Sequence, residues 1–414
     1  MTTKNENTKD IDFSTSAVPQ SQRRSFLTMF MIMLGFTFFS ASMWVGQQMA
    51  DGLDFGGFLG ALILGGIILS FYTGTLAYVA AKTGMSMDLL AIKAFGEKGS
   101  YISSAMISLT QIGWFGVGVA MFAIPVANEL FGGSTFVTYL LVVIAGILMT
   151  SSAYFGIKSL TIVSYVAVPC VAILGTVAMI MAVQRGDGTF LENFARSSGT
   201  LTMVGGAGLV VGSFVSGGTA TPNFARFAKN TRDGVITTVI AFFIGNSLMF
   251  FMGAVSSIYV GGNDIFEVLI NLGLFYVAIL VLGLNIWTTN DNALYSGGLS
   301  LSNITGIRKR PLVIVSGVIG TVASVYLYNN FVNWLSFLNA TLPPIGAIII
   351  FDYFGHPQHY EAGAEAVPGV HWGAVAGVVA GALAGNFIHA GIASINAMLT
   401  GCICYLVYDK ATGR

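Results

Sequence analysis

The sequence predicts an all-α polytopic membrane protein with about twelve transmembrane helices. Of its 414 residues, 55% are hydrophobic and only 9% are charged, whereas a soluble domain carries about 25% charged residues. The apolar residues gather in stretches near the ~20 residues that a spanning helix needs. They lack the ~10-residue alternating segments of a transmembrane barrel. The predicted helices cover 26–50, 56–81, 101–128, 135–155, 160–183, 202–229, 234–260, 272–300, 312–328, 331–354, 371–389 and 391–408.

Basic residues alternate from one loop to the next along this helix order. All but two of the 18 Lys and Arg residues precede the first helix, follow an even-numbered helix or lie in the C-terminus. The exceptions are Arg185 and Arg196. Basic loops stay cytoplasmic during membrane insertion, so both termini are predicted to be cytoplasmic. Residues 1–22 are polar and are expected to form a disordered cytoplasmic N-terminus, without the apolar core of a signal peptide.

The chain is predicted to consist of two five-helix halves followed by two further helices. The halves cover 23–183 and 184–354, and a polar cytoplasmic loop at 355–370 precedes the last two helices and the C-terminus at 371–414. An odd number of helices in each half inverts the second half relative to the first. Inverted repeats of this kind are a common architecture of secondary transporters.

Two predicted helices contain segments that are unusual for a membrane span. The first helix contains GFTFFSASMW at 35–44, and the sixth contains VGSFVSGGTATPNF at 211–224, which is rich in Gly, Ser and Thr. Unwound backbone in hydrocarbon costs several kcal/mol for each unpaired group, unless it faces protein, ligand or a wet cavity. Interrupted helices at matching positions of two repeats indicate a transporter binding site. The alternative is that both are flexible packing segments.

The eighth helix carries the densest polar run inside a predicted span, LNIWTTNDNALYSGG at 284–298. It includes Asp291, the only carboxylate well inside a span. Polar groups within a membrane are costly and are usually functional. Interhelical hydrogen bonding is the structural alternative.

The polar run offers oxygen ligands for a cation. Thr288 and Thr289 follow Asn285 by three and four residues, so the Asn285 carbonyl lies in the same groove as both hydroxyls. Carbonyls of Gly35 and Phe38 in the interrupted first helix complete an all-oxygen shell. Neutral hard oxygens suit Na⁺ as a coupling ion.

The third and sixth helices offer groups that suit a flat organic ligand. Gln111 and Trp114 share one face of the third helix, and Phe214 lies within the predicted interruption of the sixth. Two aromatic side chains beside one gap indicate stacking on a planar substrate. Packing or an interfacial belt is the alternative for Trp114. Further contacts to the ligand's edge are expected from the backbone around Gly212, Ser213 and Ser216 and from the amide of Asn285.

Other candidate sites in the sequence have structural explanations. The sequence contains no HExxH, Walker A or GxSxG motif, and GGAGLVVG at 205–212 does not match GxGxxG, so no enzyme, cofactor or nucleic-acid site is predicted. A glycine ladder on the eleventh helix is interpreted as helix packing, with a dimer contact as the alternative. The cysteines are expected to be packing residues and the histidines to be solvated. These residues are Gly373, Gly377, Gly381 and Gly385; Cys170, Cys402 and Cys404; and His356, His359, His371 and His389.

Several segments together resemble the bacterial nucleobase–cation symporter family, and the similarity runs over roughly 20–408. The segments of the third and eighth helices are specific to it. The resembling segments are VPQSQRRS (18–25), MLGFTFFSASMW (33–44), TQIGWFGVGVAMFAIPV (110–126), VVGSF (210–214), FFIGNSLMF (242–250) and VLGLNIWTTNDNALY (281–295).

The resemblance implies a LeuT-like fold with a five-plus-five inverted repeat, two additional helices, and breaks in helices one and six. It also implies Na⁺-coupled uptake of cytosine by alternating access in a bacterial inner membrane, without an obligate protein partner. Its stacking residues correspond to Trp114 and Phe214, its helix-three amide to Gln111, and Phe39 lines the pocket. The sodium ligands implied are the carbonyls of Gly35, Phe38 and Asn285 and the hydroxyls of Thr288 and Thr289.

Three alternatives remain open at this point. A proton-coupled nucleobase or purine symporter of the same fold would use Asp291 as its relay. A channel would conduct without saturation, although no ring-forming filter motif is present. A membrane-embedded enzyme would convert the substrate rather than move it.

Overall fold

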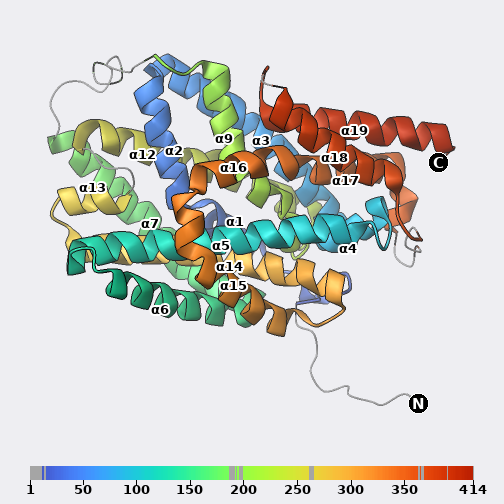
Figure 1. Ribbon diagram of the computed structural model, residues 1–414, viewed down its shortest axis with the longest axis horizontal. Helices are drawn as coiled ribbons and strands as arrows, with labels where there is room; N and C mark the ends of the chain where they lie inside the picture. Colours follow the sequence, from blue (N-terminus) through green and yellow to red (C-terminus); the bar gives the residue numbers. More distant parts are fainter. Residues whose placement is uncertain are drawn as a thin grey trace.

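The computed structural model describes residues 12–13, 15–185, 192, 194, 199–260, 265–361, 364, 368–388 and 390–413. Every regular element in these ranges is a helix, as the all-α prediction requires (Figure 1). Among the described residues, seven helical segments are long and apolar enough to span a membrane, and one bent pair makes an eighth candidate. The long uninterrupted helices are α3 (Phe55–Thr83), α5 (Ser100–Phe131), α6 (Thr135–Tyr154), α7 (Ile157–Arg185), α14 (Phe275–Thr305) and α15 (Lys309–Asn329).

The first spanning segment is interrupted where the sequence predicts. It consists of α1 (Phe26–Thr37) and α2 (Ser40–Gly52), which meet at a bend of 55°. Phe38 and Phe39 connect the two halves, and Phe39 has extended backbone angles. Both side chains are buried, so the unwound residues face protein rather than lipid.

The sixth spanning segment breaks later than the sequence predicts. Helix α9 (Met203–Thr219) continues without interruption through Phe214, and α10 (Pro222–Ala225) follows a turn at 220–221. The hydroxyls of Ser213 and Thr219 donate to carbonyls one turn earlier in α9, so these polar residues are satisfied within the helix. Pro222 has no N–H and begins the next helix, which places the break beside it.

Two further irregularities lie next to these breaks. The seventh segment runs from α11 (Thr231–Val239) through a π-helical turn, η2 (Ile240–Gly245), into α12 (Asn246–Val260). A Cβ atom on Gly245 would lie 2.8 Å from Leu34, so glycine lets this turn approach the break of helix one. The tenth segment is divided into α16 (Phe331–Thr341) and α17 (Pro343–Gly355). Tyr72 of α3 connects the break in the sixth spanning segment with the break in the tenth. Its hydroxyl lies 2.8 Å from Thr219 Oγ1 and 3.4 Å from the Pro343 carbonyl.

The last two helices pack against α17 within the same chain. They are α18 (Trp372–Phe387) and α19 (Ala393–Thr412). A Cβ atom on Gly377 would lie 2.7 Å from the Gly401 carbonyl of α19, and one on Gly381 would lie 2.7 Å from Pro344 of α17. The glycine ladder therefore serves helix packing, as predicted.

One end of the bundle, to the right in Figure 1, carries α4 (Met87–Phe95) and the C-terminal end of α19. It is called the basic end here, because Lys93, Arg226, Lys309 and Lys410 lie at the ends of the helices there. The backbone N–H of His371, just before α18, donates to the carbonyl at the end of α4. On the opposite end, α13 (Ile265–Asn271) lies in the connection before α14.

Part of the N-terminal segment that the sequence predicts to be disordered packs against the bundle in the structure. Asp12 is buried, and its carboxylate lies 2.8 Å from Lys309 Nζ. The guanidinium of Arg226 donates to the backbone carbonyls of Asp12 and Phe13, at 2.7 and 2.9 Å. Two buried cations need acceptors, and the segment supplies them. Residues 1–11 and 14 lie outside the described residues, as do Arg196 and His389.

Candidate functional site

A small cavity lies between α1, the break of helix one at Phe39, α5, α9 and α14. Its volume is about 20 Å³, which holds about one water molecule. A larger molecule enters only when the surrounding side chains move, so the structure shows the site closed. The lining residues are Phe36, Phe39, Gln111, Trp114, Ser213, Phe214, Ser216, Gly217, Thr289 and Ala293.

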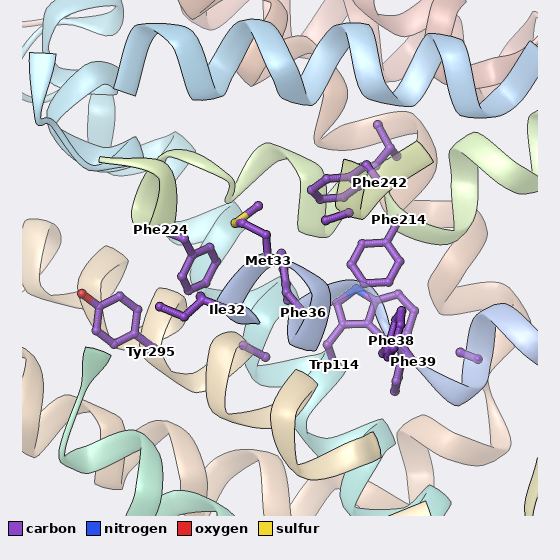
Figure 2. Close-up of a cluster of buried hydrophobic side chains, with 14 of the residues drawn as sticks. Ile32, Met33, Phe36, Phe38, Phe39, Trp114, Phe214, Phe224, Phe242 and Tyr295 are labelled. Carbon is purple, nitrogen blue, oxygen red and sulfur yellow. The ribbon is translucent and has the colours of Figure 1, made fainter. Parts of the chain in front are cut away.

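Aromatic rings form most of the cavity wall. Phe39 meets Trp114 edge to face, with ring centroids 5.6 Å apart, and meets Phe214 in the same way at 6.5 Å (Figure 2). Trp114 Nε1 donates a hydrogen bond of 2.9 Å to Ser216 Oγ, which fixes the orientation of the indole. Because Phe214 lies in regular helix, its ring reaches the cavity as a side chain of α9 rather than from an unwound segment. The structure thus places the side chains of Trp114 and Phe214 at one cavity, as predicted. The backbone that carries Phe214 is regular helix, however, and the prediction had it unwound.

The same correction applies to the backbone groups predicted to be free around Phe214. Gly212, Ser213 and Ser216 lie within α9, so they are not part of an interruption. Gly212 faces Asn339 of α16, and a Cβ atom there would collide with the Asn339 amide. The side chains of Ser213 and Ser216 still line the cavity.

Gln111 supplies an amide group to the cavity wall. It is buried, and within the described part of the chain its Nε2 has no hydrogen-bond partner. An unpaired buried donor costs about 1–3 kcal/mol. A ligand whose edge accepts this hydrogen bond removes that cost, so the geometry favours a guest with an acceptor facing α5.

The side chain of Asn285 has a different position from the predicted one. Its Oδ1 accepts hydrogen bonds from the Ser40 backbone N–H at 2.8 Å and from Ser40 Oγ at 2.7 Å. The amide therefore caps the first residue of α2, and it is not among the cavity-lining residues. The break leaves the first backbone N–H groups of α2 without acceptors inside the helix. The Asn285 side chain points toward Ser40 because it supplies one of these acceptors.

The predicted cation ligands converge at the break of helix one. Thr289 Oγ1 lies 3.5 Å from the Phe38 carbonyl and 3.4 Å from the Asn285 carbonyl, and Thr288 Oγ1 lies 2.9 Å from the same Asn285 carbonyl. A Cβ atom on Gly35 would lie 3.5 Å from Thr288 Cβ, so this glycine is adjacent. Hydroxyl rotors that now donate to carbonyls can present lone pairs to a cation instead. The residues present therefore fit a Na⁺ ion, with neutral oxygen ligands from α1 and α14.

Residues that sequence reasoning missed also lie at the site. Ser164 of α7 is buried, and a Cβ atom on Gly35 would lie 2.7 Å from its Oγ. One serine in an apolar helix carries no motif, so only the packing of α7 on α1 places it here. Phe36, Gly217 and Ala293 line the cavity but look like ordinary core residues in the sequence.

Asp291 lies outside the cavity, on the side of α14 that faces α6. Its carboxyl group accepts a hydrogen bond from Ser152 Oγ, and Trp287 Nε1 donates to the same serine at 2.8 Å. Among the described residues, Asp291 Oδ2 has no hydrogen-bond partner. The carboxyl group is buried, and Asp291, Ser152 and Trp287 are not among the residues that line the cavity.

Interrupted helices that meet around a closed internal cavity define a multi-pass membrane transporter. The chain belongs to the family of permeases for cytosine/purines, uracil, thiamine and allantoin, whose model matches residues 17–408. It is similar to the cytosine permease of Escherichia coli strain K12, with 45% identity over 407 residues, 98% of this chain and 96% of that protein. The family indicated by the sequence motifs is confirmed. These relatives are permeases, so the enzyme alternative is excluded.

Solved structures establish the fold. Mhp1, a nucleobase-cation-symport-1 family transporter in a closed conformation with bromovinylhydantoin bound, superposes with a TM-score of 0.81 at 20% identity over 97% of this chain and 95% of that chain. A Na⁺-coupled sialic acid symporter superposes with a TM-score of 0.72 at 14% identity, covering 98% and 93%. The predicted LeuT-like transporter fold is therefore confirmed.

Proposed function

We propose that this protein imports cytosine in symport with Na⁺ by alternating access. One observation carries the proposal: the aromatic cavity with the unpaired amide of Gln111 adjoins the oxygen cluster at the break of helix one. The 45% identity to a cytosine permease supports cytosine as the substrate.

The substrate would bind by stacking and by one directed amide. A pyrimidine ring stacks on Trp114 and Phe214, and such stacking contributes about 1–3 kcal/mol per base. Gln111 then donates to an acceptor on the edge of the base. Analogues without that acceptor leave the buried amide unpaired and are rejected for that reason.

Thr289 is the structural link between substrate and ion. It lines the cavity and also lies 3.5 Å from the Phe38 carbonyl in the oxygen cluster. A Na⁺ ion held by α1 and α14 would fix Thr289 and the neighbouring Phe39, and so would order the cavity wall. Each ligand should then tighten the binding of the other by the same factor.

The orientation and the domain boundaries are part of the same proposal. We place the basic end and both termini in the cytoplasm of a bacterial cell, and the chain in the inner membrane, because basic loops remain inside. The inverted repeats would cover 23–183 and 184–354. A protein partner is not needed for transport in this scheme.

Uptake into proteoliposomes tests the proposal. Radiolabelled cytosine should accumulate, saturably and unchanged in identity, when an inward Na⁺ gradient is imposed at equal pH on both sides. Uptake that ignores the Na⁺ gradient contradicts Na⁺ coupling, and a non-saturating flux indicates a channel.

Proton-coupled nucleobase transport is the second candidate, and Asp291 is the observation that favours it. This carboxyl group is buried and has one unpaired oxygen within the described residues. In that scheme Asp291→Asn abolishes accumulation driven by a pH gradient while Thr289→Ala leaves it intact. Under Na⁺ coupling the two variants show the opposite order of severity.

A further inference from the structure

A cluster of imidazoles and carboxylates lies at the basic end, apart from the cavity. Asp352, His356 and His359 each offer one ligand atom, and these three atoms lie within 4.8 Å of one another. Asp352 and His356 are four residues apart at the end of α17, and His359 lies three further on in the 3-10 turn η3 (Pro357–Tyr360). Residues at these spacings share one side of a helix or a 3-10 turn. This corrects the expectation that the histidines are simply solvated.

Asp352 is held in place by two tyrosines. Its side chain is buried, Tyr360 donates to Oδ2, and Tyr405 of α19 donates to Oδ1 at 2.7 Å. Each carboxylate oxygen has two lone pairs, so both oxygens keep a site for a metal ion. Hydrogen bonds of this kind are the usual support of a ligating carboxylate.

His356 lies between two carboxylates. Its Nδ1 is 3.4 Å from Asp352 Oδ1, and its Nε2 is 3.5 Å from Asp409 Oδ2 of α19. Metal bonds of about 2.0–2.1 Å in tetrahedral geometry put neighbouring ligand atoms about 3.4 Å apart. The Nδ1 side therefore has the spacing of a ligand pair with Asp352. On the other side Asp409 can accept the Nε2 proton, which is the carboxylate–histidine–metal arrangement that orients a ligating imidazole.

His371 lies beside Asp409, at ion-pair rather than hydrogen-bond distance. The Ala374 backbone N–H donates to His371 Nδ1 at 3.0 Å, so in the neutral ring the proton is on Nε2. That Nε2 lies 3.9 Å from Asp409 Oδ1. The cluster thus combines residues from α17, η3, the start of α18 and the end of α19.

We propose that Asp352, His356 and His359 bind one divalent transition-metal ion, of the Zn²⁺ class, with Asp409 orienting His356. Two imidazoles and one carboxylate select such an ion over Na⁺, Mg²⁺ or Ca²⁺, which prefer oxygen ligands. The fourth position is left for water. Because Asp352 belongs to α17 and His356 directly follows it, while Asp409 and Tyr405 belong to α19, the bound ion strengthens the attachment of the last helix to the transporter core.

The test is a Zn²⁺ titration of the full chain in lipid nanodiscs, carried out without a polyhistidine tag. One Zn²⁺ should bind per chain and should raise the thermal midpoint of unfolding. X-ray absorption at the zinc edge should show only nitrogen and oxygen neighbours, at about 2.0–2.2 Å. Sulfur at about 2.3 Å would instead assign the ion to Cys402 or Cys404 and overturn the proposal.

Variants locate the site. His356→Ala and His359→Ala should each lower the Zn²⁺ affinity at least tenfold, and Asp409→Asn should lower it about 10- to 100-fold as an orienting group. Glu361→Gln is the matched control, because Glu361 is an exposed carboxylate beside Tyr360 and should leave the affinity unchanged.

Besides sulfur neighbours, two further results would overturn the proposal: absence of stoichiometric binding at micromolar Zn²⁺, and binding that survives both histidine substitutions. If those variants do not fold, the absorption spectrum of the unmodified chain still decides between this site, a thiolate site and no site. None of these readouts depends on the transported substrate, so failure here is separate from failure of the transport proposal.

Discussion

Asn285 of α14 caps the second half of the broken first helix, because its Oδ1 accepts both the backbone N–H and the hydroxyl of Ser40. The local N-cap residue, Phe39, has no side chain that can do this. One amide thus connects α14 to the first residue of α2, directly after the break that carries the Phe38 carbonyl.

Asn285→Ala should lower both stability and transport. Loss of a cap costs about 0.5–2 kcal/mol, and a buried N–H left without a partner costs about 1–3 kcal/mol. Asn285→Asp retains the acceptor and should unfold at a higher temperature than the alanine variant. Asn386→Ala is the control, since Asn386 is exposed and its amide bonds only within its own helix. Equal melting of the two Asn285 variants would contradict the capping role.

Trp114→Ala should weaken cytosine binding by about 1–3 kcal/mol, roughly 5- to 150-fold, because a stacking face is removed. Equilibrium binding of labelled cytosine to purified protein measures this. Unchanged affinity would place the substrate elsewhere.

Ser216→Ala should weaken cytosine binding less than Trp114→Ala does. Its effect comes from releasing the indole N–H that Ser216 accepts at 2.9 Å. In a Trp114→Phe background, which has no N–H, Ser216→Ala should therefore have little further effect. Additive losses in the double variant would show that Ser216 contacts the substrate directly.

Thr289→Ala and Thr288→Ala should raise the Na⁺ concentration required for half-maximal uptake, since each removes one oxygen from the cluster. Thr289→Ser keeps the oxygen and should remain close to the unmodified protein. Thr75→Ala provides the control, because the Thr75 hydroxyl only bonds back to Phe71 in its own helix. Na⁺ titration of uptake at fixed pH is the measurement, and a Na⁺ dependence that none of these variants alters would exclude this ion position.

Gly35→Ala should impair Na⁺-dependent uptake although alanine normally favours a helix by about 1 kcal/mol over glycine. The new Cβ would lie 2.7 Å from Ser164 Oγ and 3.2 Å from Ser164 Cβ. Adding Ser164→Gly removes both atoms and should restore part of the uptake. Absence of rescue would indicate that the Gly35 backbone itself, rather than this contact, is what the substitution disturbs.

Lys309→Met should destabilise the basic end by about 3–5 kcal/mol, because it leaves the buried Asp12 carboxylate without its ion-pair partner. Asp12→Asn in the same chain should recover part of that loss. Thermal unfolding of the two single variants and the double variant measures the coupling. A double variant as unstable as the sum of the two would show that the pair does not interact energetically.

The sequence by itself determined the class of this protein, its helices and its first break. Apolar stretches of spanning length have few alternatives in a bilayer, since every backbone group must be paired within its own segment. The unusual segment at 35–44 predicted a break in the first helix, and the structure places that break at Phe38 and Phe39. The spacing of Asn285, Thr288 and Thr289 placed three oxygens in one groove.

Only the tertiary structure decided where polar groups find their partners. The Gly- and Ser-rich stretch around Phe214 stays helical because its hydroxyls bond to their own helix and Pro222 stops it later. Asn285 turns to Ser40, and Asp12 binds at Lys309, because a helix end and a buried cation each demand an acceptor that local sequence does not supply. Buried polar groups and charges need partners, and here those partners come from segments far apart in the chain. A local sequence pattern therefore cannot predict which residues pair.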